Sequence, residues 1–392
     1  MTVTDAERRA RLVARHHLGR TASDVTTAVR DLVALHSSDP TSPHLSLWAR
    51  VPGYATVDLD EALCQDRDLW RLHAMRRTLW VAGAVDAPML EASSTRKVAA
   101  AERRRILGWL DDADEITNPE AFIDDLGRRI LVALADGPRS TQELGDLVDG
   151  FGTRVTLGSG KWAQQAPIGP RILYLLAMQL DLVRGTPTGT FRSSQYAWAR
   201  TDRWFDTVPD RLDVRDAQAA LAGRWLLAFG PATTDDVHWW TGWTKGDTRR
   251  ALGGLGAVAV TLEDGTEAWL HPDDPGGDPD PAGTVALLPS LDPTPMGWKG
   301  RDFYLDDGFV PELFDHSGNV GPTVWADGRI VGGWYVRDDG DVTVGAVPLA
   351  DVGPDTTARI EAEVERLQGW LDVAINPRFP TPLETRLRVG EA

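Results

Sequence analysis

The chain has 392 residues and a formal net charge of −17, with 42% hydrophobic and 25% charged residues. Its length predicts about two to four domains, and this composition excludes extensive disorder. The only cysteine, Cys64, excludes an internal disulfide framework, and no segment resembles a signal peptide or a membrane span. We therefore expect a cytoplasmic protein without membrane contact.

The charge is distributed unevenly along the chain. Residues 1–110 carry 16 basic and 13 acidic residues, a balance of +3, so the remainder carries 25 basic and 45 acidic residues, a balance of −20. Charges farther apart than about 8–10 Å are screened at physiological salt, so a basic face can act beside an acidic body. The net charge argues against indiscriminate nucleic-acid binding. The alternative is that the basic clusters are solvated helix faces.

The first part of the chain predicts four helices followed by a strand pair. Amphipathic spacing places these helices at residues 5–19, 23–34, 41–51 and 58–67. Asp58 is the expected cap of the fourth helix. Residues 69–82 have two apolar ends around a short polar bend and predict two strands, and residues 86–110 predict a basic helix. This order is typical of a winged helix, which we assign to residues 1–118.

The turn between the second and third predicted helices carries candidate catalytic residues. His36, Ser38 and Asp39 precede Pro40 and Pro43, a helix-start pattern in which Ser or Asp caps backbone N–H groups. A helix N-terminus disfavours imidazolium, so His36 should be neutral and able to accept a proton. Beside Ser38 and Asp39 it could position and deprotonate water. The alternative is that Ser38 and Asp39 are only caps and that His36 is a packed loop residue.

A repeat begins after residue 119. Residues 135–144 and 228–237 both fit Ala-x-Gly-Pro-x-(Ser/Thr)-Thr-x-acid-aliphatic, in which Gly and Pro end one helix and Ser140 or Thr233 caps the next. Each copy continues with an amphipathic segment and two alternating strands: 169–180 with 182–185 and 191–198, and 246–255 with 257–262 and 267–270. Three helices and a two-stranded wing predict winged helices at residues 119–205 and 206–272.

The last part of the chain is rich in predicted strands. Residues 271–283 have the Pro, Gly and Asp composition of a linker, and a β-rich domain is expected at 283–392. Its strands are predicted at 284–288, 323–326, 329–332, 333–336 and 342–347, and a helix at 355–373 should cover the sheet. Asp327-Gly328 is a preferred two-residue hairpin turn. Trp298 lies in a Pro- and Gly-rich segment, where it could stack in a cleft or be a buried structural residue.

Several motifs of the chain, taken in sequence order, resemble those of a known family. They are Leu-Val-Ala-Leu-His-Ser-Ser-Asp-Pro (32–40), Leu-Trp-Ala-Arg-Val (47–51), Ala-Met-Arg-Arg-Thr-Leu (74–79), two Gly-Pro helix starts, Leu-Leu-Pro-Ser-Leu-Asp-Pro (287–293) and Asp-Gly-Arg-Ile-Val-Gly-Gly-Trp (327–334). Over about residues 5–385 the chain resembles the AlkZ/YcaQ-type winged-helix DNA glycosylases. The resemblance implies an α+β fold with three tandem winged-helix domains and a C-terminal β-barrel-like domain. It also implies a monofunctional DNA glycosylase that removes N-alkylated purines, including bulky or crosslinked adducts, in DNA repair or self-resistance.

The expected catalytic loop departs from the family pattern. The family carries Gln-x-Gln or Gln-x-Asp, whereas the matching positions here are His36, Ser37 and Ser38. We expect His36 to hold and activate water, Asp39 to support developing positive charge, and Ser38 to bond to water or phosphate; one general base contributes typically ~10²–10⁴-fold. The replacements could equally mark altered or lost activity. The alternative function is therefore a non-catalytic winged-helix DNA-binding protein, either a regulator or a lesion sensor.

The expected partner is double-stranded DNA that carries alkylated purines. Arginine binds phosphate bidentately and hydroxyls position the backbone, which gives a set of candidate contacts: Arg71, Arg76, Arg77, Thr78, Lys161, Arg171, Trp298 and Arg301. The alternative for each arginine is an ordinary ion pair. The histidines lack metal-ligand spacing and no nucleotide-binding glycine pattern occurs, so we expect no metal and no cofactor. Because the chain has no coiled-coil heptads, we expect a monomer.

Overall fold

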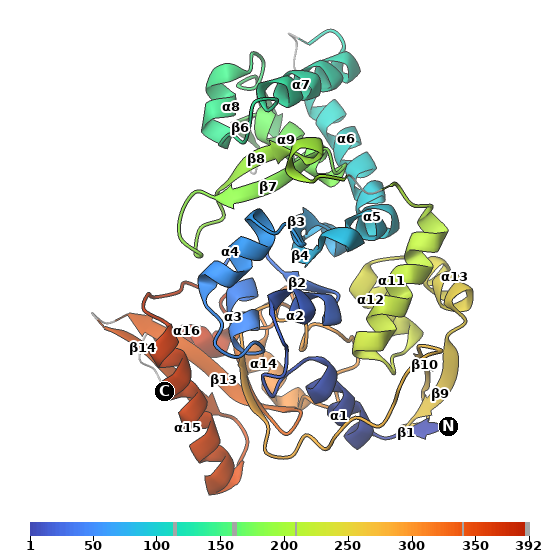
Figure 1. Ribbon diagram of the computed structural model, residues 1–392, viewed down its shortest axis with the longest axis vertical. Coiled ribbons are helices and arrows are strands. Elements are labelled where there is room, and N and C mark those ends of the chain that lie inside the picture. The colour runs from blue at the N-terminus through green and yellow to red at the C-terminus, as the bar shows by residue number, and fades with distance from the viewer. Residues whose placement is uncertain (113–115, 159–162, 208–209, 339–340, 389–392) are drawn as a thin grey trace.

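The computed structural model describes residues 1–112, 116–158, 163–207, 210–338 and 341–388. Helices and strands are mixed along the chain, which confirms the predicted α+β class. Residues from about 96 to 200 form one end of the molecule, at the top of Figure 1. The first 90 residues lie at the centre, between the helices near residues 214–255 on one side and the C-terminal sheet on the other. None of the described helices is long and apolar enough to span a membrane.

The N-terminal part folds as short helices around a three-stranded antiparallel sheet of order β2-β4-β3. The hairpin of β3 and β4 confirms the strand pair predicted for residues 69–82. The elements of this part are β1 (Thr2–Val3), α1 (Asp5–Arg15), α2 (Val25–Asp31), β2 (Ala34–His36), α3 (Ser42–Trp48), α4 (Thr56–Cys64), β3 (Leu69–His73), β4 (Leu79–Gly83), α5 (Ala87–Leu90) and α6 (Arg96–Asp111).

Two details of this part differ from the prediction. The second helix ends at Asp31 rather than near residue 34, because Val33 adopts a left-handed φ of 67° and the chain then pairs with β4 as β2. Asp58 does not precede α4. It is the third residue of that helix, and its carboxylate accepts the backbone N–H of Ala55 at 2.8 Å.

Residues 119–200 contain the predicted helices and their terminal strand pair. The elements are α7 (Pro119–Ala133), α8 (Thr141–Leu147), β5 (Arg154–Leu157), β6 (Gln164–Pro167), α9 (Gly169–Met178), β7 (Leu182–Pro187) and β8 (Tyr196–Arg200). Ser140 caps α8 as predicted, because its hydroxyl accepts the N–H of Glu143 at 3.2 Å and the Glu143 carboxylate accepts the N–H of Ser140 at 2.7 Å. The β5–β6 hairpin was not predicted from the sequence.

The second copy of the repeat has a short first helix, three further helices and a terminal strand pair, but among its described residues no hairpin between its last two helices. It contains α10 (Thr201–Trp204), α11 (Val214–Phe229), α12 (Thr234–Thr241), α13 (Lys245–Leu255), β9 (Val258–Leu262) and β10 (Glu267–Leu270). Thr233 caps α12 through the same reciprocal bonds to Asp236 that Ser140 makes to Glu143. The N-terminal strand β1 adds to β9 in a parallel pairing, which the sequence did not indicate.

The C-terminal part is an open antiparallel sheet of order β11-β12-β13-β14. Its elements are β11 (Val285–Leu288), α14 (Val310–Leu313), β12 (Thr323–Ala326), β13 (Arg329–Asp338), β14 (Val342–Pro348), α15 (Gly353–Trp370) and α16 (Pro382–Arg388). Among the described residues no pairing closes β11 onto β14, so the barrel-like shape is not confirmed. The two strands predicted at 329–336 are one strand, and α15 packs against the sheet as expected.

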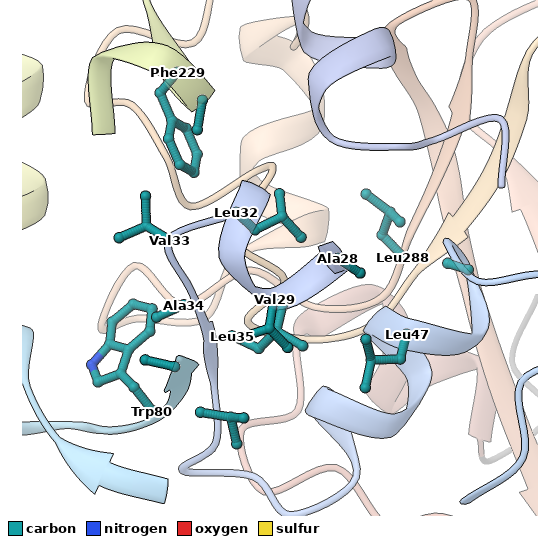
Figure 2. Close-up of a cluster of buried hydrophobic side chains, with 14 of the residues drawn as sticks. Ala28, Val29, Leu32, Val33, Ala34, Leu35, Leu47, Trp80, Phe229 and Leu288 are labelled. Carbon is teal, nitrogen blue, oxygen red and sulfur yellow. The ribbon is translucent and has the colours of Figure 1, made fainter. Parts of the chain in front are cut away.

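Buried apolar side chains form one large cluster that joins several parts of the chain. Figure 2 shows part of it, in which side chains of α2, of β2 and of the residues between them, among them Leu32 and Leu35, are gathered in one cluster with Phe229 of α11 and Leu288 of β11. A second cluster is confined to residues between Ala99 and Trp198. The tandem winged-helix arrangement and its domain boundaries stay predictions.

A fully buried ion pair connects α3 to the loop after β11. Arg50 donates from Nη2 to Asp292 Oδ1 at 2.7 Å and from Nη1 to Asp292 Oδ2 at 2.8 Å, and neither side chain is exposed. Ser46 donates to the same carboxylate at 2.7 Å, and Arg50 also donates to Thr294 and to the carbonyl of His16. The charges are therefore well compensated. Removing one partner would leave the other charge buried and unpaired.

We expect Asp292→Ala to lower the free energy of unfolding by about 3–5 kcal/mol, because the Arg50 charge would lose its carboxylate in the interior. Urea denaturation followed by circular dichroism measures this loss. The control is Arg386→Ala, which breaks an exposed pair with Glu312 and should cost at most about 1 kcal/mol. Equal losses in the two variants would contradict the special role of the buried pair.

Candidate functional site

The loop from β2 to α3 carries His36, Ser38 and Asp39. His36 is the last residue of β2 and pairs with Trp80 of β4, and its ring packs edge-on against that indole with 4.8 Å between ring centroids. The N-cap of α3 is Thr41, which makes no side-chain capping bond. Neither Ser38 nor Asp39 caps the helix, in contrast to the expectation from the sequence.

His36 is neutral at pH 7, as expected, but for a different physical reason. Burial is the main cause that lowers its pKa to about 4, and the nearby positive charge of Arg76 adds to the effect. The ring Nδ1 lies 3.3 Å from the backbone nitrogen of Ser38 and accepts its N–H. A neutral ring that accepts at Nδ1 carries its proton on Nε2. In this tautomer His36 offers a hydrogen-bond donor at Nε2.

Ser38 and its neighbour are held by the β3–β4 hairpin. The Ser38 hydroxyl oxygen accepts the backbone N–H of Leu79 at 3.3 Å, and the Ser37 hydroxyl oxygen accepts from Arg71 Nε at 3.2 Å. The accepted bond leaves the Ser38 hydroxyl proton available to another acceptor. Arg71 itself is buried and lies over the ring of Tyr196 at 4.5 Å.

Arg378 fixes the same loop from the far end of the chain. Its guanidinium donates to the carbonyl of Ser38 at 2.8 Å, and its backbone N–H donates to Asp39 Oδ2 at 3.1 Å. The other carboxylate oxygen of Asp39 accepts from the backbone and hydroxyl of Thr41. Sequence analysis missed Arg378, because the contact spans about 340 residues and leaves no local pattern.

A cleft of about 860 Å³ lies beside the loop and is lined by residues of the central sheet and of the β7–β8 hairpin. Ser37 and Ser38 line it, whereas His36 and Asp39 are not among its lining residues. Its charged lining residues are Arg77, Arg184 and Arg378, and the described part of the lining contains no Asp or Glu. A cleft lined by positive charges attracts anions even in an acidic chain, although one of the three arginines, Arg77, is also paired with Glu102, which is not among the lining residues.

The tip of the β3–β4 hairpin holds two arginines in an unusual backbone conformation. Arg76 and Arg77 have φ angles of 55° and 65°, in the left-handed region, and the N–H of Thr78 closes the turn on the carbonyl of Met75 at 3.2 Å. Such turns favour Asn and Gly, and each left-handed residue with a long side chain costs about 1 kcal/mol or more. The turn therefore holds two adjacent cations in a strained backbone conformation.

The turn also brings distant candidates together. Arg76 and Arg301, which are far apart in the sequence, both lie over the ring of Trp239, at 4.9 and 5.1 Å from its centroid. Arg77 forms an ion pair with Glu102 at 3.2 Å and lines the cleft. The Thr78 hydroxyl donates to the carbonyl of Met75, within the turn.

The remaining candidates are scattered. Arg171 lies 5.7 Å from the ring of Trp109 and does not line the cleft. Trp298 is only 3% exposed and its indole N–H donates to the carbonyl of Phe229, so it is the buried structural tryptophan that the sequence left as the alternative. Lys161 lies outside the described residues. Within the described ranges no group of three His, Cys, Asp or Glu residues could hold a metal ion.

A second carboxyl group lies on the other side of the loop. Glu384 of α16 is 6% exposed, and it lines a small cavity of about 20 Å³ with Asp39. Its Oε2 has no hydrogen-bond partner among the described residues. Burial raises the pKa of Glu384 to about 7, and the charge of Asp39 contributes in the same direction.

We expect Glu384→Gln to change how stability depends on pH. The folded pKa of about 7 exceeds the ordinary value of 4.5, so the wild-type protein loses stability as pH rises from about 4.5 to 7. The variant cannot ionise at this position. Its free energy of unfolding relative to wild type should therefore rise by about 2 kcal/mol between pH 5 and pH 8, since one pKa unit corresponds to about 1.4 kcal/mol. Urea denaturation at both pH values tests this, and a constant difference would contradict it.

Comparison with known proteins identifies the family of this chain. The family model of DNA glycosylase AlkZ-like proteins matches residues 29–370. A search of curated proteins finds no matching sequence. Among solved structures, the DNA glycosylase AlkZ of Streptomyces sahachiroi is similar in fold, with a TM-score of 0.69 and 18% sequence identity over 96% of this chain and 100% of that chain. Because the family model covers most of its length, this chain belongs to the AlkZ-like DNA glycosylase family.

Proposed function

We propose that this protein hydrolyses the N-glycosidic bond of purines alkylated at N7 or N3 in double-stranded DNA, including bulky or crosslinked adducts. One observation carries the proposal. The cleft beside Ser38 is lined by three arginines and, in its described part, by no carboxylate. This is notable because the chain belongs to a DNA glycosylase family and has a net charge of −17. A polyanionic strand suits such a cleft. We propose a monofunctional enzyme that acts as a monomer and needs no cofactor.

The chemistry places modest demands on the protein. An N7- or N3-alkylated purine already carries a positive charge and departs as a neutral base when its bond to C1′ breaks. Water then forms a bond to C1′ and releases a proton, which leaves an abasic site. The protein must hold the strand, place the water and favour the positive charge that develops on the sugar.

The loop residues have separate roles in this proposal. Ser38 lines the cleft, and its free hydroxyl proton can bond to the water or to a phosphate. His36 orients the water by donation from Nε2, and it becomes a general base only if the 3.3 Å contact with the Ser38 amide breaks. Asp39 is 3% exposed, so it supports positive charge electrostatically rather than by contact. Arg71 acts on the loop through Ser37.

A non-catalytic DNA-binding protein is the second candidate function. It is favoured by the position of His36, whose ring packs against Trp80 and does not line the cleft. Such a regulator or lesion sensor would use the same arginines to bind the backbone without releasing a base.

Base excision distinguishes the two functions. With duplex DNA that carries 7-methylguanine, we expect the wild-type protein to release the base and to leave abasic sites that hot alkali cleaves. His36→Ala and Ser38→Ala should each slow this release by about 10²-fold, a size typical for loss of a group that positions or activates water. The control is His316→Ala, an exposed position that does not line the cleft. DNA binding without any release by the wild type would favour the non-catalytic function. An unchanged rate in His36→Ala would remove that residue from the mechanism.

The strained turn gives a prediction in which stability and affinity move in opposite directions. The double variant Arg76→Asn with Arg77→Gly suits two left-handed positions, so stability should stay equal or rise by about 1 kcal/mol. Duplex affinity should fall about tenfold or more, because two cations leave the turn. Thermal unfolding and fluorescence anisotropy measure the two effects.

The control for the turn variant removes the same charge at two exposed sites elsewhere, with Arg215→Asn and Arg359→Asn. Equal losses of affinity in the two double variants would show that the effect follows net charge and not the turn.

A further inference from the structure

Strand β7 places a buried cation in the wall of the cleft. Arg184 is 8% exposed and pairs with Trp198 across the β7–β8 hairpin. Its guanidinium carbon lies 4.8 Å from the ring centroid of Trp198 and 5.5 Å from that of Tyr174. Both aromatic residues line the cleft with it. Burial lowers the pKa of Arg184 to about 10, so it remains cationic at neutral pH.

The described neighbours of Arg184 leave one of its guanidinium nitrogens, Nη1, without a hydrogen-bond acceptor. Aromatic rings attract a cation over their faces, but they do not replace acceptors for the in-plane N–H groups of a guanidinium. Nη1 is buried without a partner among the described residues, and the described lining of the cleft offers no carboxylate. A buried charge without a counter-ion is costly. Among the described residues no carboxylate compensates this charge, and a bound anion would do so.

A second buried polar atom of the same cleft also lacks a partner. His73 lies at the end of β3 with its ring centroid 6.0 Å from that of Tyr174, and its Nδ1 has no partner among the described residues. Burial lowers the pKa of His73 to about 3, and the positive charge of Arg184 acts in the same direction. A neutral ring can donate from Nδ1. A cation and a neutral ring thus line one cleft, each with a buried nitrogen that has no hydrogen-bond partner among the described residues.

We propose that Arg184 and His73 bind a backbone phosphate of the DNA strand that occupies the cleft. The planar guanidinium matches the oxygens of a phosphodiester, and His73 adds a hydrogen bond from Nδ1. An alkylated purine is cationic and would be repelled by Arg184 in this poorly solvated position, so the site holds the backbone and not the damaged base. The proposal rests on the proposed function only in its choice of DNA as the partner; it does not require base release.

The test is the affinity of the full-length protein for an unmodified fluorescent duplex, measured by anisotropy over a range of salt concentrations. Arg184→Met keeps the packing volume and removes the charge. It should weaken binding about tenfold and reduce the slope of log affinity against log salt by about 0.9, the value for one phosphate contact. Arg184→Lys should recover most of the affinity. The control Arg359→Met removes an exposed charge on α15, outside the cleft, and should change affinity less than twofold.

His73→Phe provides an independent variant. It should weaken binding about threefold and leave the salt slope unchanged, because the ring is neutral. If Arg184→Met does not fold, as judged by thermal unfolding, this variant and Arg184→Lys carry the test. Wild-type affinity in Arg184→Met, or in His73→Phe where Arg184→Met does not fold, overturns the proposal.

Two further outcomes separate this proposal from the proposed enzyme activity. Release of 7-methylguanine by an Arg184→Met protein with wild-type affinity would leave the glycosylase standing and overturn the phosphate site. Binding that depends on Arg184 in a protein that releases no base would support the phosphate site and reject the glycosylase.

Competition by inorganic phosphate at constant ionic strength is the last experiment. A variant that loses only this competition, and not duplex binding, would show a site for free phosphate and overturn the proposal.

Discussion

The buried pair of Arg50 and Asp292 is the constraint on which the geometry of the site depends. Arg50 follows α3, and Asp292 belongs to the loop after β11, so the pair fixes the far end of α3 against the C-terminal part of the chain. Ser42, the first residue of α3, donates to the carbonyl of Ser290 and fixes the near end at 2.7 Å. The loop that carries Ser38 ends at this helix. Its position in the cleft is therefore set by residues about 250 positions away, and Arg378 completes the support from the C-terminal segment.

Features that depend on neighbouring residues were predictable. The capping boxes at Ser140 and Thr233 and the β3–β4 hairpin follow from residue types within a few positions, because caps and strand alternation are local. The end of α2 was not predictable. Nothing in its sequence shows that Val33, a β-branched residue, adopts a left-handed φ so that the chain can enter the central sheet as β2. Tertiary pairing with β4 overrides the helical pattern at this point.

The sequence named part of the lining of the cleft but not the physical causes at the site. Of the predicted residues, Ser38 and Arg77 line the cleft, whereas His36 and Asp39 do not, and their functional roles stay predictions. The neutrality of His36 was derived from a helix N-terminus, but burial causes it. Glu384 and Arg184 were missed because their surroundings come from distant segments: α16 reaches Asp39 across the molecule, and β7 carries Arg184 toward β3. An arginine in a strand pattern gives no sign of whether a carboxylate will face it.

The absence of carboxylates from the described lining of the cleft has a consequence for the proposed chemistry. Three arginines without bound phosphate are electrostatically unfavourable for a cationic purine and for a sugar that gains positive charge. In the proposed mechanism, phosphates of the bound strand would reverse this, because each would neutralise an arginine and bring its negative oxygens close to the reacting nucleotide. The substrate would then supply the field that stabilises its transition state, and the protein would supply the positions of the phosphates. A loop with His36 and Ser38, in place of the Gln-x-Gln or Gln-x-Asp that the resemblance implies, would suffice for this role. The proposed leaving group is already charged, so the water would need orientation more than deprotonation, and the main contribution of the protein would be geometric.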